Sequence, residues 1–234
     1  MGANPSRYAG VGIAPGVAIT GVPAAGNMLV ASSATAAAWE GYADATTAAG
    51  WSPADAGLLA WTYDPVLALN SSTPSAAGAV NLVRVNVRQA ISCTNVVLGV
   101  ATAGTLLTAS ENFAGLYAGQ TAGGYTAGHL IGTSADQSTA WATAGYYPMA
   151  LASGPFALVP GFYWVAILAN SSGGTSACPA FTRTINQNAG IANLGLAAAS
   201  SRYANTGTGD TTLPASFTPS GLTQAGVGWW AGLS

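Results

Sequence analysis

The stretch VNLVRVNVRQA, from Val80 to Ala90, decides the fold class because apolar and polar residues alternate along it. Successive residues of a strand point to opposite faces, so the stretch has two distinct sides. One side carries Asn81, Val83, Val85 and Val87, and the other carries Leu82, Arg84, Asn86 and Arg88. A period of two residues, rich in valine, predicts a half-buried β-strand.

Strand-like segments continue after this stretch until the end of the chain. Turn signals separate them roughly every 8–12 residues, as in sandwiches and barrels of antiparallel strands. The sequence therefore predicts an all-β protein, with an antiparallel, jelly-roll-like β-sandwich head over residues 76–234. The segments are TNVVLGVAT, TLLTA, NFAGLYAG, YTAGHLIGTS, YYPMALA, FALV, GFYWVAILAN and AFTRTI.

Residues 1–75 have a different character, since they lack long strand patterns and are dense in alanine, glycine and proline. They predict an extended N-terminal arm broken by turns. A short helix is expected between Ser52 and Ala60, because Pro53 suits the first turn and Asp55 suits the positive end of the helix dipole. The run from Asn70 to Ala79 has the composition of a linker, and it separates arm from head.

Charge is scarce throughout the chain. Charged residues make up 5% of the sequence, against about 25% in an ordinary soluble domain, and lysine is absent. The net charge of −2 provides no electrostatic reason to bind nucleic acid or an anionic membrane surface. A surface this poor in charge is typical of proteins that pack against other copies in a large assembly.

An uncharged segment from Met149 to Ala169 raises the possibility of a membrane span. Pro155 and Pro160 interrupt it, whereas a spanning helix needs about 20 mostly uninterrupted apolar residues. We expect two buried strands joined at Pro160–Gly161, and no membrane insertion. The N-terminus shows no basic start followed by an apolar core, so no signal peptide is expected.

The residue types used in catalysis are few and scattered. Glu111 and Asp136 sit beside predicted turns, where carboxylates commonly cap backbone N–H groups, so a glycosidase pair is disfavoured. His129 is the single histidine, and Ser134 lies outside any G-x-S-x-G elbow. We therefore expect no enzymatic activity.

Cofactor and metal motifs are equally absent from the sequence. No phosphate-binding glycine motif occurs, and three Cys and His residues in total are too few for a structural zinc site. We expect no cofactor and no metal. Cys93 and Cys178 are either two buried small residues or a disulfide, and both readings stay open.

Two groups of residues are candidates for binding. Arg84 and Arg88 share one strand face, where they either hold a carboxylate or a neighbouring subunit, or form a solvated surface. Aromatic residues at predicted loops and strand ends suit glycan contact, with core packing as the alternative for tryptophan. These are Tyr125, Trp141, Tyr146 and Tyr147.

Two parts of the sequence resemble proteins of tailed bacteriophages. The run GNMLVASSATAAAW, Gly26 to Trp39, is similar to the phage-fibre pattern G-x-V-L-T-A-T-S-A-T-A-A-x-W, from which Met28 and Val30 depart. Most of residues 80–234 resembles β-sandwich heads of minor tail and fibre proteins of actinobacterial phages. The segments that carry this second likeness are VRVNVRQAISCTNVVLGVATAGTLLTASENFAGLYAG, GTSADQSTAWATAGYYPMAL, PGFYWVAILAN and LPASFTPSGLT.

The resemblance implies a virion structural protein, either a tail fibre or tail-tip (minor tail) protein whose head contacts host surface glycans. A capsid-surface head fibre or decoration protein is the main alternative, and a cell-wall polysaccharide depolymerase is a weaker one. The expected location is the virion surface, and the expected partners are other virion proteins, host envelope carbohydrate and further copies of the chain. A homotrimer would bury the apolar residues of the arm. The residues expected to serve oligomerisation and attachment are Met28, Leu29, Val30 and Trp39.

Overall fold

The computed structural model describes residues 18–20, 27–33, 36–41, 51–185 and 188–234. The chain divides into two compact units, Met1–Ser52 and Pro53–Ser234.

The described residues of the first unit form a small three-stranded sheet. Its strands are β1 (Ala18–Thr20), β2 (Asn27–Ser33) and β3 (Ala36–Gly41), in the order β1-β3-β2. β2 and β3 run antiparallel, with Leu29 opposite Trp39, and β1 runs parallel to β3. The predicted extended arm thus contains a hairpin.

The structure does not describe the side chains of four residues that were predicted to serve oligomerisation and attachment. They are Met28, Leu29, Val30 and Trp39. The backbone register pairs Leu29 with Trp39, Met28 with Glu40 and Val30 with Ala38. Their role in oligomerisation therefore stays a prediction.

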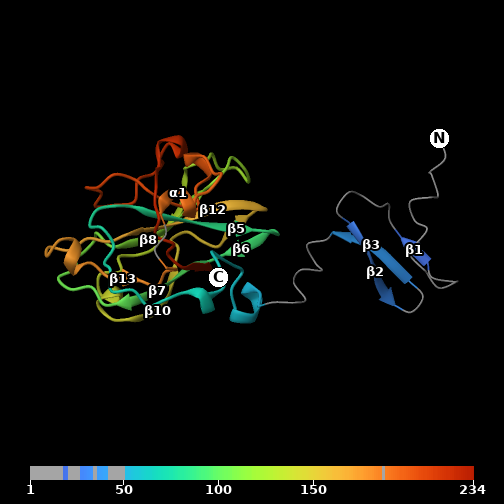
Figure 1. Cartoon of the computed structure of the whole chain (residues 1–234), viewed down its shortest axis with the longest axis horizontal. Coiled ribbons are helices and arrows are strands. Elements are labelled where there is room, and N and C mark those ends of the chain that lie inside the picture. The colour runs from blue at the N-terminus through green and yellow to red at the C-terminus, as the bar shows by residue number, and fades with distance from the viewer. Residues whose placement is uncertain (1–17, 21–26, 34–35, 42–50, 186–187) are drawn as a thin grey trace. The chain divides into compact units, whose positions relative to one another are not determined.

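The second unit is built around two larger sheets, seen as layers in Figure 1. The five-stranded sheet has the order β10-β7-β16-β4, and β13 also pairs with β7; the six-stranded sheet has the order β15-β14-β5-β12-β8-β9. Strands of the five-stranded sheet are β4 (Ala60–Trp61), β7 (Asn95–Thr102), β10 (Gly145–Ala150), β13 (Ala180–Phe181) and β16 (Ala231–Leu233). Those of the six-stranded sheet are β5 (Asn81–Val87), β8 (Phe113–Ala118), β9 (Leu130–Thr133), β12 (Gly161–Leu168), β14 (Tyr203–Asn205) and β15 (Thr223–Gln224).

A further short pair, β6 (Ile91–Cys93) and β11 (Phe156–Leu158), completes the strands of this unit. All strand pairs described in this unit are antiparallel. The prediction of a mostly β protein with antiparallel sheets in a sandwich-like fold is confirmed.

The main core lies between the two sheets. Val83, Val85 and Val87 of β5 face it from the six-stranded sheet, as the alternation predicts, and Val96 and Leu98 of β7 face it from the five-stranded sheet. Burial of these alternate side chains is the main driving force that holds the layers together.

A second core covers the other face of the six-stranded sheet. The prediction of a half-buried strand for β5 is therefore wrong, because residues on both of its faces are buried. Leu82 is fully buried there beside Tyr117 and Trp164, because the chain between α1 (Ala189–Ala192) and η8 (Pro219–Gly221) folds over them. Figure 1 shows α1 beyond β12, on the side away from β7. Polar anchors hold this cover in place: the Tyr117 hydroxyl donates to the Pro214 carbonyl at 2.7 Å, and Trp164 Nε1 donates to the Ser201 carbonyl at 3.1 Å.

The compact second unit begins at Pro53, so it includes residues 53–75, which precede the predicted boundary between arm and head. The predicted helix is present as the shorter 3-10 helix η3 (Pro53–Ala56), followed by β4 and by η4 (Pro65–Leu67). The Leu59 N–H donates to the Leu233 carbonyl at 2.8 Å. Ser75, in the predicted linker, is buried. Short pairings with distant residues connect residues 53–75 to the sandwich. Such pairings need no periodic pattern in the local sequence, so the sequence analysis did not detect them.

The uncharged segment from Met149 to Ala169 contributes to three strands, where the sequence predicts two. It contains the end of β10, then β11, and finally β12, which begins at Gly161 directly after Pro160. In the described part of the chain, no helix has the length and apolar character needed to cross a membrane.

Candidate functional site

Two arginines lie opposite each other at the point where β14 and β5 stop pairing. The last paired residues are Tyr203 and Val83, and the next step places Arg202 opposite Arg84. The Arg84 N–H donates to the Arg202 carbonyl at 2.8 Å, which confirms that the two residues are cross-strand neighbours. Like charges directly opposite each other destabilise a sheet, so this pair calls for a compensating group.

The side chain of Arg84 is held by three contacts. Its Nε donates to Asn86 Oδ1 at 3.0 Å, its Nη1 donates to the Ser200 carbonyl at 3.0 Å, and its guanidinium carbon lies 4.2 Å from the centre of the Phe162 ring. Stacking on an aromatic face and two hydrogen bonds orient the planar group. The guanidinium is therefore positioned before any ligand arrives.

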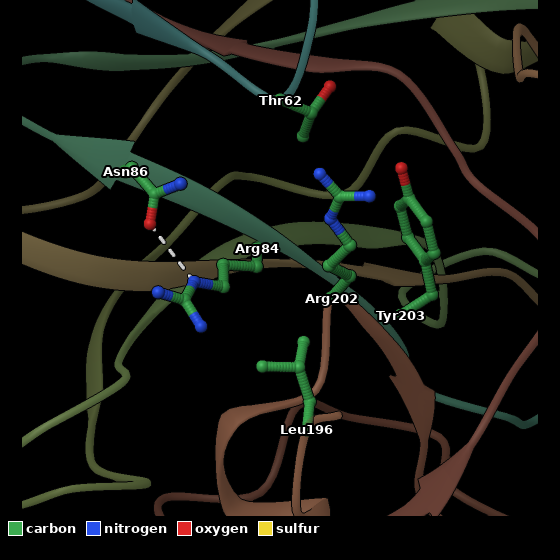
Figure 2. Close-up of a pocket in the computed structure, with 6 residues that line it drawn as sticks. All are labelled: Thr62, Arg84, Asn86, Leu196, Arg202 and Tyr203. Atoms are coloured by element: carbon green, nitrogen blue, oxygen red, sulfur yellow. Dashed lines mark hydrogen bonds between the residues drawn. The ribbon is translucent and has the colours of Figure 1, made fainter. Parts of the chain in front are cut away.

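A cavity of about 230 Å³ opens beside the two arginines. It is lined by Thr62, Arg84, Asn86, Leu196, Arg202 and Tyr203. Figure 2 shows Arg84 turned toward Asn86, while Arg202 extends toward Thr62 and Leu196 lies on the other side. Residues from three distant segments meet here, so only the tertiary structure assembles the site.

The electrostatics of the cavity favour an anion. Burial and the neighbouring positive charge of Arg202 lower the pKa of Arg84 below its ordinary value. Within the described part of the chain, neither Arg84 nor Arg202 forms an ion pair with a carboxylate. Burial raises the pKa of Tyr203, so its hydroxyl stays protonated and able to donate.

Asn193 holds the side of the cavity that carries Arg202 and Tyr203. Its Oδ1 accepts from the Arg202 N–H at 2.7 Å and from the Tyr203 N–H at 3.2 Å. Its Nδ2 donates to the carbonyls of Ala189, Tyr203 and Ala225 at 3.0–3.1 Å. This buried amide therefore fixes the backbone from which Arg202 projects.

The sequence left two readings open for Arg84 and Arg88, a shared binding face or a solvated surface, and of the two only Arg84 lines the cavity. β5 ends at Val87, and Arg88 is exposed outside the cavity. The partner of Arg84 is Arg202, which the sequence analysis did not select. Arg202 follows a run of small and polar residues, and no spacing signal links it to β5.

The four aromatic candidates for glycan contact have different surroundings. Trp141 follows the alternative of core packing: the residue is fully buried and meets Phe181 edge-on, at 5.0 Å between ring centres. Trp141 belongs to the main core, and burial of a large aromatic side chain makes a large favourable contribution to the free energy of folding. Trp141 has no surface on which a sugar can stack.

Tyr146 is 63% exposed, and its ring lies edge-on to Trp230 at 6.1 Å between centres. Tyr147, the next residue, alternates to the inner face of β10, and its hydroxyl donates to the Thr143 carbonyl at 2.9 Å. Tyr125 stacks on His129 at 5.9 Å. Among the four candidates, Tyr146 presents the most accessible ring for an external ligand.

Asp136, Ser134 and His129 have local structural contacts. Asp136 accepts from the Asn112 N–H and from the Ser138 hydroxyl, and these hydrogen bonds lower the pKa of its carboxyl against the opposing effect of burial. Ser134 is buried, and its hydroxyl donates to the Ala135 carbonyl at 2.7 Å. His129 is exposed and stacks on Tyr125 instead. Their hydrogen bonds do not connect them into a triad.

The cysteines are free thiols buried in the main core. This agrees with the reading of Cys93 and Cys178 as small apolar residues. Burial raises the pKa of Cys93 to about 11 and also raises the pKa of Cys178. In the described residues, no group of three or more His, Cys, Asp or Glu side chains gathers as a metal site would require.

Comparison with known proteins assigns the chain to no family. No protein-family model matches it, and no curated protein is significantly similar to it. The interpretation of the cavity therefore rests on its own residues and contacts.

Proposed function

We propose that the chain is a non-enzymatic structural protein of a tailed-phage virion, placed at the tail fibre or tail tip, and that its sandwich unit contacts host surface glycans. The observation that carries the proposal is the division of the chain into two units. The first unit contains the run Gly26–Trp39 that resembles phage fibres, and the second is a sandwich whose strands cover the second resemblance. One unit attaches to the particle and the other is presented outward.

The surface of the sandwich supports a binding role rather than a catalytic one. Tyr146 offers an exposed ring, and the cavity at Arg84 and Arg202 offers fixed donors. Aromatic rings and a few convergent polar groups are the usual elements of carbohydrate recognition. The jelly-roll-like topology and the homotrimer belong to the same proposal.

The location is tested by labelling particles with an antibody raised against the sandwich unit. Phage particles are purified from a lysate that produces the chain, then labelled with gold and viewed by electron microscopy. Label at one end of the tail is the expected result. Label over the whole capsid would replace the tail assignment with a head fibre or decoration protein, and absence of the chain from the particles would refute both.

The homotrimer is tested separately on the purified full-length chain. Light scattering should report three times the 23.0 kDa mass of one chain. The variant Trp39→Ser is expected to weaken the trimer, while Tyr146→Ser in the other unit serves as the matched control. A stable monomer of the unmodified chain would refute the trimer.

A further inference from the structure

The cavity beside Arg84 is lined by side chains with unused hydrogen-bond donors. A guanidinium carries five N–H groups, and Arg84 uses one on Asn86 and one on Ser200, which leaves three. The exposed guanidinium of Arg202 lines the same cavity. Two guanidinium groups with spare donors match the oxygens of a carboxylate or a phosphate.

The other lining residues suit a sugar ring that carries such a group. The hydroxyl of Thr62 accepts from the Ala231 N–H at 3.1 Å, so its own proton is available to a ligand. Asn86 contributes an amide nitrogen, and Leu196 contributes an apolar surface for ring carbons. Drug-sized ligands occupy roughly 300–1,000 Å³. The smaller cavity, about 230 Å³, therefore suits a single compact unit.

We infer that this cavity binds a monosaccharide unit that carries an oxyanion, either the carboxylate of a uronic acid or the phosphate of a sugar phosphate. The oxyanion lies between Arg84 and Arg202, and Thr62 and Asn86 bind ring hydroxyls. The inference rests on the proposed glycan-contacting role for its biological setting, and it names acidic rather than neutral envelope glycans as the ligand. Bound anion also relieves the repulsion between the two opposed arginines.

Isothermal titration of the full-length chain tests the inference with four probes: glucuronate, glucose 6-phosphate, glucose and inorganic phosphate. Glucuronate, glucose 6-phosphate or both should bind at least tenfold more tightly than glucose, and more tightly than inorganic phosphate. Raising the ionic strength should weaken binding, because salt screens charge attraction. Equal binding of glucose and both acidic sugars, or no binding of either acidic sugar at millimolar concentration, would overturn the inference.

Three single variants identify the site. Arg84→Gln and Arg202→Gln should each weaken binding of the acidic sugar at least tenfold, since each removes a charged hydrogen-bond donor from the oxyanion. Arg88→Gln removes an equal charge from the end of the same strand, outside the cavity, and should leave the affinity unchanged. Because the Arg202 side chain is exposed, its replacement keeps the fold, and unchanged affinity in Arg202→Gln would overturn the inference.

The sugar titration and the particle labelling can each refute its own proposal without refuting the other. A chain that labels the tail but binds no acidic sugar retains the proposed virion role and loses this inference. A chain that binds acidic sugar through Arg84 and Arg202 but is absent from particles retains the site and loses the virion role.

Discussion

Asn193 joins three segments that cover the outer face of the six-stranded sheet, and its replacement tests how that cover is held. The side chain is 2% exposed and makes five hydrogen bonds, all to backbone groups. Asn193→Ala removes all five at once. The affected groups belong to α1, to the start of β14 and to Ala225, which follows β15.

The expected cost follows from the backbone groups left without partners. The Tyr203 carbonyl still accepts from the Ala225 N–H at 2.9 Å, and the Ala189 carbonyl still accepts from the Asn193 N–H at 3.1 Å. The Arg202 N–H and the Ala225 carbonyl are more severely affected, and an unsatisfied buried group costs about 1–3 kcal/mol. We expect a loss of about 3 kcal/mol in the free energy of unfolding, or about 6–12 °C in Tm for a domain of this size.

The assay is urea denaturation of the full-length chain, followed by tryptophan fluorescence, with thermal melting as a second measure. Asn188→Ala is the matched control, because Asn188 is exposed and its side chain makes one hydrogen bond, from the Gly190 N–H at 2.8 Å. The control should lose about 1 kcal/mol, as for other N-cap replacements. Equal losses for the two variants would refute the idea that Asn193 holds the cover.

Asn193→Asp separates the donor role of the amide from its acceptor role. An ionised carboxylate keeps the bonds from Arg202 and Tyr203 but places oxygen against three carbonyls. These carbonyls favour the protonated carboxyl and so raise its folded-state pKa. The variant should therefore gain stability as the pH falls and lose it as the pH rises, and a stability independent of pH would contradict this reading.

Three further predictions concern the rest of the sandwich unit. Gly128→Ala should destabilise more than Gly124→Ala. Both residues have positive φ, +80° and +88°, but an added Cβ clashes with the Phe217 carbonyl oxygen at Gly128 and meets open space at Gly124. Equal shifts in Tm would contradict this. Cys93 and Cys178 should not react with Ellman's reagent at pH 8 until the chain is unfolded, because burial raises both thiol pKa values, that of Cys93 to about 11; rapid reaction in the folded chain would show that the thiols are accessible. Trp141→Ala should cost about 3–5 kcal/mol in urea denaturation, and a loss below 1 kcal/mol would contradict its position in the core.

The sequence alone determined the predominantly β character of the chain and the inward face of the sandwich. Val83, Val85 and Val87 alternate with polar residues, and strand geometry converts that period of two directly into a buried face. The same local information identified Pro160–Gly161 as a strand junction, because proline and glycine act on the backbone at their own positions.

Tertiary structure alone decided where the sandwich begins, which face of β5 is covered and which charges meet. Leu82 is buried because a segment more than a hundred residues later folds over it, and Arg84 faces Arg202 because β14 pairs with β5 there. Trp141 is buried by the same kind of distant contact. Local alternation records which residues share a side of one strand, whereas burial and charge pairing depend on which remote segment lies against that side.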